Sequence, residues 1–116
     1  MGQDAGGVTC SITVDGATST CVLTLVGEAD LAATDDLARA LAEADATGCH
    51  TVIVDGRGLQ FLDVHCLGLL VSFHENLASH GRQSLLTQPQ PVVRTLLRVL
   101  ETPLQVLEDP PAGRET

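Results

Sequence analysis

The chain has 116 residues, a length that fits one domain with a buried core. Its formal net charge is -9, with six arginines as its only strongly basic residues, which excludes a nucleic-acid partner because phosphate backbones require a concentrated basic surface. No apolar run reaches the roughly 20 residues of a membrane helix, and the opening segment MGQDAGGVTC lacks the basic and apolar regions of a secretory signal. We therefore expect a cytoplasmic protein without membrane insertion.

The first part of the chain predicts a β hairpin followed by a helix. Residues 8–14 and 20–26 alternate apolar and polar side chains, and turn-forming residues separate the two runs. Thr34 is expected to be the N-cap of the helix, with Asp35 and Asp36 in the first turn, where the helix dipole favours carboxylates. The expected buried stripe of this helix consists of Leu37, Ala40, Leu41 and Ala44.

The rest of the chain alternates strands and helices. Residues 51–54, TVIV, form a continuous β-branched run that is typical of a strand covered on both faces. A helix from about Asp63 to His80, a short strand at 84–87, a helix opened by Pro91 and a last strand at 104–107 follow. The order ββαβαβαβ predicts an α/β fold: a mixed sheet, mostly parallel with one antiparallel N-terminal hairpin, covered by about three helices.

These patterns leave the two ends of the chain without a predicted element. We expect one domain over residues 8–109, with a disordered N-terminal tail at 1–7 and a C-terminal tail at 110–116. The four cysteines form no CxxC pair, and we expect free thiols.

The segment FLDVHCLGLL, residues 61–70, is the most informative, because it turns from the central strand into the second helix. Asp63 is a natural N-cap there. Backbone N–H groups of the next residues would then point out of the helix start, which is a place where anions bind.

The second helix has two apolar faces. At about 100° per residue, Leu67 and Leu70 lie on one face, whereas His65, Leu69 and Phe73 lie on roughly the opposite one. One face must cover the sheet, and in so small a domain no element remains to cover the other. We expect this second face to be a partner-binding patch, although scattered exposed apolar residues are common on any surface.

Three motifs give the chain a family resemblance: GEADL at 27–31, VIVD at 52–55 and FLDVHCLG at 61–68. Together with the element order, they resemble the STAS domain of anti-sigma factor antagonists. The resemblance implies a protein that binds an anti-sigma factor of the serine kinase type and so releases a sigma factor. Phosphorylation at the start of the second helix abolishes this binding in the family. The partner-binding residues implied by family position and helix geometry are Asp30, Leu31, Asp63, Val64, His65, Cys66, Leu69 and Phe73.

The chain departs from the family at the phosphorylation site. Val64 stands where the phosphorylated serine would be, His65 replaces the next hydroxyl residue and Cys66 replaces a glycine. A valine cannot be esterified by phosphate. The first interpretation is therefore an antagonist without serine-phosphorylation control. The alternative is a non-phosphorylatable STAS regulatory or scaffold subunit of a transporter or stress-signalling assembly.

A third interpretation is new chemistry at the helix start, and we disfavour it. Neighbouring helical residues diverge by about 100°, so His65 and Cys66 do not converge on one metal ion. The chain has no Gly-rich nucleotide loop, GxSxG or HExxH motif. Asp30, Asp55 and Asp63 would share one sheet edge, but without a nucleophile they indicate caps and turns. We expect no enzyme activity, cofactor or metal. An exposed apolar helix face would also serve a homodimer.

Overall fold

The computed structural model describes residues 7–107 and contains the predicted mixed sheet. The strands are β1 (Gly7–Asp15), β2 (Thr20–Ala29), β3 (Thr51–Leu62), β4 (Gln83–Thr87) and β5 (Val106–Leu107), in the spatial order β1-β2-β3-β4-β5. β1 and β2 are antiparallel and the remaining pairs are parallel, which confirms the predicted fold class. The expected tails lie outside the described residues except for Gly7, which already belongs to β1.

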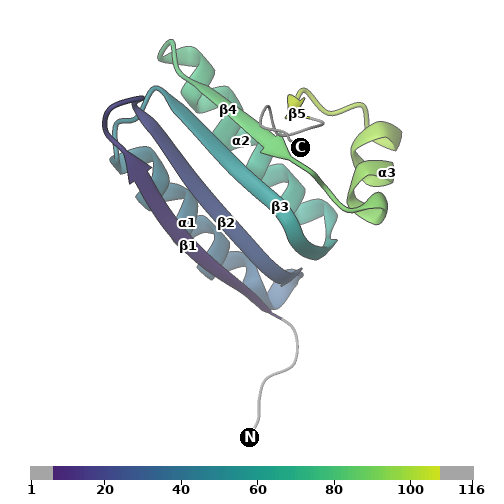
Figure 1. Ribbon diagram of the computed structural model, residues 1–116. Helices are drawn as coiled ribbons and strands as arrows, with labels where there is room; N and C mark the ends of the chain where they lie inside the picture. Colours follow the sequence, from purple (N-terminus) through teal and green to yellow (C-terminus); the bar gives the residue numbers. More distant parts are fainter. Residues whose placement is uncertain (1–6, 108–116) are drawn as a thin grey trace, which may run out of the picture.

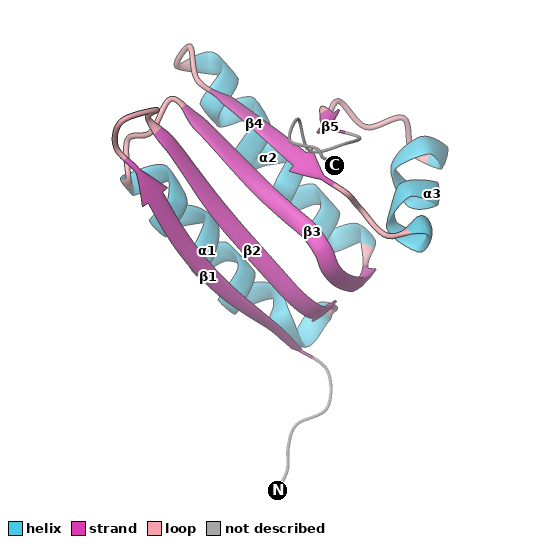
Figure 2. Cartoon of the chain, viewed as in Figure 1, coloured by secondary structure: helices cyan, strands magenta, loops and turns pink. Residues whose placement is uncertain are grey.

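Three α-helices connect the parallel strands. They are α1 (Thr34–Ala46), α2 (Val64–Ser79) and α3 (Pro91–Val99), and a short 3-10 helix, η1 (Leu31–Ala33), precedes α1. Figure 1 shows α1 and α2 side by side behind the sheet, with α3 apart from them beyond β3 and β4. The opposite face of β1 and β2 carries no helix (Figure 2). None of the helices within residues 7–107 combines the length and apolar character that a membrane span requires.

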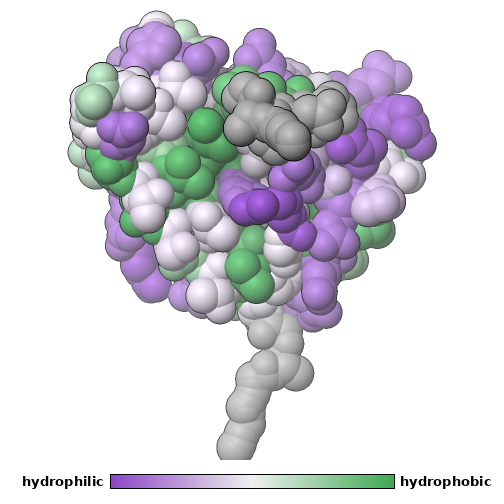
Figure 3. All heavy atoms as spheres, in the orientation of Figure 1, coloured by the Kyte–Doolittle hydropathy of each residue, from purple (hydrophilic) through white to green (hydrophobic). Residues whose placement is uncertain are grey.

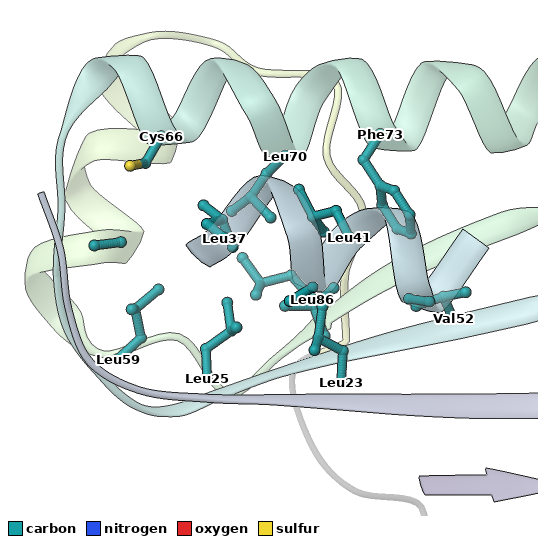
Figure 4. Close-up of a cluster of buried hydrophobic side chains, with 14 of the residues drawn as sticks. Leu23, Leu25, Leu37, Leu41, Val52, Leu59, Cys66, Leu70, Phe73 and Leu86 are labelled. Carbon is teal, nitrogen blue, oxygen red and sulfur yellow. The ribbon is translucent and has the colours of Figure 1, made fainter. Parts of the chain in front are cut away.

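The core lies between the sheet and the α1–α2 layer. Alternation along β2 directs Cys21, Leu23 and Leu25 toward the helices, where they are fully buried. The predicted stripe of α1 is buried against them, and Figure 4 shows Leu37 and Leu41 within the same cluster as Leu23 and Leu25. Hydrophobic burial of these aliphatic side chains holds the helices in place.

Two local predictions were wrong. Thr34 is the first residue of α1 and not its N-cap, because η1 leads directly into α1 and its last residue, Ala33, is the N-cap. The Thr34 hydroxyl donates to the carbonyl oxygen of Leu31 at 2.9 Å. β3 has 12 residues and extends well past residue 54. Val52 and Val54 are buried, but Ile53 on the other face is only half-buried, so the cover of this strand is complete on one face alone.

Two glycines, Gly27 and Gly58, allow neighbouring strands to approach each other closely. Gly27 has a φ of 116°, and a Cβ there would lie 2.6 Å from the carbonyl oxygen of Gly7 on β1. A Cβ at Gly58 would lie 3.0 Å from a methyl group of Val26. Side chains at these positions would therefore push the strands apart, so Gly27 keeps β2 close to β1 and Gly58 keeps β3 close to β2.

Candidate functional site

The candidate site lies where β2 and β3 end, beside the start of α2. The backbone N–H of Asp63 donates to the carbonyl oxygen of Ala29 at 3.0 Å, and the Cys66 thiol donates to the carbonyl oxygen of Asp30 at 3.4 Å. These two bonds join the loop after β2 to the first turn of α2. The structure therefore brings together two of the three sequence motifs, which are far apart in the chain.

Asp63 is the N-cap of α2, as predicted. Its backbone is extended, and its Oδ1 accepts a hydrogen bond from the Cys66 N–H at 2.7 Å. This bond satisfies one of the N–H groups that a helix start leaves without a partner. The positive end of α2 thus already holds a carboxylate, and an added phosphate would meet that negative charge.

Exposed apolar side chains surround this capped helix start. Leu31 is 73% exposed, Val64 is 64% exposed and Phe61 at the end of β3 is 43% exposed. His65 is also exposed. We name this region the α2-start surface, and it consists of Asp30, Leu31, Phe61, Asp63, Val64 and His65. This surface combines three exposed apolar side chains with two aspartates and a histidine.

Two predicted contact residues lie in the core. Cys66 is 0% exposed and Phe73 is 8% exposed, so the expectation that Phe73 lies on an open helix face was wrong, and Cys66 presents no side-chain surface to a partner. Figure 4 shows Phe73 pointing from α2 into the cluster that contains Leu41 of α1 and Val52 of β3. α1 packs against the side of α2, so α2 is buried against a helix as well as against the sheet. Leu69, the remaining predicted residue of that face, is half-buried.

Comparison with known proteins assigns the family. A family of STAS domains, described as "Mlab, STAS domain", matches residues 12–102. The chain belongs to the STAS domain family. A search of curated protein sequences found no significant match.

Solved structures with the same fold include two anti-sigma factor antagonists. This STAS domain is similar to one from Mycobacterium paratuberculosis, with a TM-score of 0.73, 19% identity and coverage of 84% of this chain and 85% of that one. The unphosphorylated form of SpoIIAA gives a TM-score of 0.68 at 20% identity, covering 88% of this chain and 90% of that one. The phosphorylated form of SpoIIAA from Bacillus gives a TM-score of 0.68 at 20% identity, covering 89% and 93%. These likenesses support the fold.

The thiol at the start of α2 is not set up as a nucleophile. Burial raises the pKa of the Cys66 thiol, and the neighbouring Asp63 carboxylate raises it further, although the Thr34 hydroxyl acts in the opposite direction. A reactive cysteine requires a lowered pKa and access to solvent. Within residues 7–107, no three His, Cys, Asp or Glu side chains gather as a metal site would require. The Cys66 thiol of this STAS domain therefore lacks both features of a reactive cysteine.

The three aspartates that were expected at one edge do not all reach it. Asp55 lies inside β3, well before its end at Leu62, and forms an ion pair with Arg57 at 2.9 Å. Burial alone would raise the pKa of Asp55, but the hydrogen bonds and charge of Arg57 outweigh it and leave that pKa below its usual value. Asp55 thus has a local structural role, and the α2-start surface contains only Asp30 and Asp63 of the three.

One carboxylate oxygen of Asp30 is a hydrogen-bond acceptor in an unusual environment. This atom, Oδ1, is buried and receives no hydrogen bond from any residue in the described part of the chain. A buried acceptor without a donor costs free energy. The loop after β2 therefore carries an unsatisfied buried acceptor directly beside the start of α2.

The exposed position of Phe61 was not predicted from the sequence. Strict alternation would place it on the same side of β3 as the buried Leu59, but the pairing register shifts so that Gly27 faces Leu59 and Glu28 faces Phe61. The extra residue in β3 turns Phe61 outward, while Leu62 is buried. The single sequence contains no signal for this bulge, because it depends on the neighbouring strand.

Proposed function

We propose that this STAS domain binds an anti-sigma factor of the serine kinase type through the α2-start surface, and so releases a sigma factor, without serine-phosphorylation control. The observation that carries the proposal is the pair of exposed apolar side chains, Leu31 and Val64, on the two segments that hydrogen bonds join at the start of α2. Desolvation of such side chains is a main source of binding free energy between proteins.

The lack of phosphorylation control rests on Val64. In the antagonist family that this chain resembles, the residue at this position is the serine that becomes phosphorylated, and the phosphate adds about -1.5 to -2 charges at the contact. SpoIIAA has been solved in both an unphosphorylated and a phosphorylated form. Val64 has no hydroxyl group and is 64% exposed. A partner would thus meet an apolar side chain here at all times, and the surface would remain competent to bind.

The negative charge of this chain indicates which charge the contact region of a partner would carry. The chain has a formal net charge of -9, and the α2-start surface includes two aspartates, Asp30 and Asp63, and no arginine. Complementary charge speeds association and favours partners with a basic contact region.

The first experiment is affinity purification of the tagged chain from its own cells, with mass spectrometry of the co-purified proteins and of the chain's modifications. We expect an anti-sigma factor kinase among the partners and no phosphate at position 64. Transporter ATPase subunits or scaffold proteins in its place would support the alternative, a regulatory subunit whose Val64 keeps it permanently in one state. Phosphate on wild-type His65 or Ser72 would contradict the absence of phosphorylation control.

Binding to the captured anti-sigma factor then tests the surface. Leu31→Asp and Val64→Asp are each expected to weaken binding at least tenfold, because each places a charge in the apolar contact. Val99→Asp on α3 is the matched control, since Val99 is 67% exposed and lies outside the surface. Equal affinities for all three variants would remove the α2-start surface from consideration. Incubation with the kinase should add phosphate to Val64→Ser and not to the wild type.

A further inference from the structure

β1 is an edge strand that is unusually open to pairing. It has nine residues and pairs with β2 alone among the described strands, while β5 lies at the opposite end of the sheet (Figure 1). Proteins usually protect such an edge with a lysine, a proline, a bulge or a short strand. β1 contains no basic residue and no proline, its register with β2 is continuous, and its only charge is Asp15 at the end.

The sequence of β1 is nearly symmetric about its centre. If two copies pair antiparallel around Ser11, Val8 lies opposite Val14 and Thr9 lies opposite Thr13. Cys10 then lies opposite Ile12, and the two serines face each other. Matched β-branched and hydroxyl pairs directly across two strands stabilise a sheet. The same two-fold arrangement makes each contact occur twice, as a symmetric dimer requires.

We propose that two copies of this chain pair through β1, antiparallel about Ser11, and join their five-stranded sheets into one. The pairing would bury Val14, which is 54% exposed, against Val8 of the second copy. It would also supply hydrogen-bond partners for the free edge of the strand. No residue of the α2-start surface belongs to β1, so substitutions in β1 test the dimer separately from the proposed anti-sigma factor binding.

The side of α1 that lies next to β1 carries charges compatible with contact to a second copy. Asp36, Arg39 and Glu43 line a groove of about 240 Å³ together with Val8 and Cys10 of β1. The groove carries both signs of charge. Arg39 forms an ion pair with Asp36 of its own chain at 3.2 Å, so the groove repels a second copy less than a groove of one sign would.

The open face of the sheet is the side from which the pairing can be probed. Thr9, Ser11 and Thr13 are exposed there. Figure 3 views the molecule from this face and shows apolar side chains among polar ones over the strands, without a continuous apolar area over β1. Substitutions at these three positions therefore perturb the proposed dimer with little effect on the core.

Disulfide cross-linking gives a test that depends on the register. In chains carrying Cys10→Ser, Ser11→Cys would place two thiols opposite each other, with Cα atoms about 4.5–5.5 Å apart, within the range of a disulfide bond. Thr13→Cys is the matched control, because residue 13 and its own copy would lie roughly 13 Å apart along the strands. We expect mild oxidation to give a covalent dimer with Ser11→Cys alone. Equal cross-linking of both variants, or none with Ser11→Cys, would overturn the proposed register.

The oligomeric state gives the second test. We expect the wild-type chain to sediment with a concentration-dependent mass that approaches twice 12.1 kDa. Ser11→Lys should weaken the dimer at least tenfold, because two lysines would face each other on the axis. Gln83→Lys on β4, also exposed, is the control and should leave it unchanged. Circular dichroism checks that both variants fold. A wild-type chain that stays monomeric, or a dimer insensitive to Ser11→Lys, would overturn the proposal.

Discussion

Replacement of Phe73 by alanine separates a core role from a contact role for this side chain. Phe73 is 8% exposed and belongs to the cluster that joins α2 to α1 and the sheet. Truncation of a buried phenylalanine to alanine costs about 3–5 kcal/mol, from the lost burial and from the cavity left behind. A domain of this size has a total free energy of unfolding of about 5–15 kcal/mol. The variant should therefore lose about a fifth or more of its stability.

Urea unfolding followed by circular dichroism measures this loss, since the chain contains no tryptophan or tyrosine for fluorescence. At about 4 °C per kcal/mol for a domain of this size, the melting temperature should fall by about 10–20 °C. Leu69→Ala, on the same helix but half-buried, is the control and should cost about 1 kcal/mol. A loss below about 1 kcal/mol for Phe73→Ala, as for an exposed residue, would refute the packing described and return Phe73 to the contact surface.

Two further predictions concern the start of α2. Asp63→Ala should lower the free energy of unfolding by about 1 kcal/mol, because the hydrogen bond from the Cys66 N–H to the capping carboxylate is lost. Asp63→Ser should restore most of this free energy, since serine is also a good N-cap. Equal stabilities of Asp63→Ala and the wild type would contradict the capping role. Burial raises the pKa of the Cys66 thiol above 9.0, so this thiol loses its proton at a lower pH in the unfolded chain than in the folded one. Its effect on the free energy of unfolding is therefore absent below about pH 9, and the free energy of unfolding falls as the pH rises further. Cys66→Ala should show a shallower decline in melting temperature above that pH, and identical slopes would contradict it.

The parts of the site that were predicted from the sequence depend on neighbours in the chain. Asp63 caps α2 through a residue three positions later, and Val64 follows the cap on the outer side of the first turn. Contacts of this range leave a signature in a single sequence. Phe61 left none, because its outward direction results from a register shift against β2.

The buried side of α2 also could not be predicted from the sequence of the helix alone. Cys66, Leu70, Phe73 and Leu77 follow one another at intervals of four, three and four residues and form one buried stripe. The prediction placed the buried stripe further round the helix and left Phe73 outside, because it assumed that only the sheet covered α2. α1 covers its side as well.

The sequence by itself determined the order of strands and helices, the hairpin, the cap of α2 and the absence of a hydroxyl at position 64. These follow from periodicity, turn residues and caps, which act over a few residues. Only the tertiary structure decided which faces are buried, how the loop after β2 is joined to the start of α2, and that β1 is left as an open edge. Those features result from packing between segments far apart in the chain, and the free energy of that packing is a property of the assembled fold.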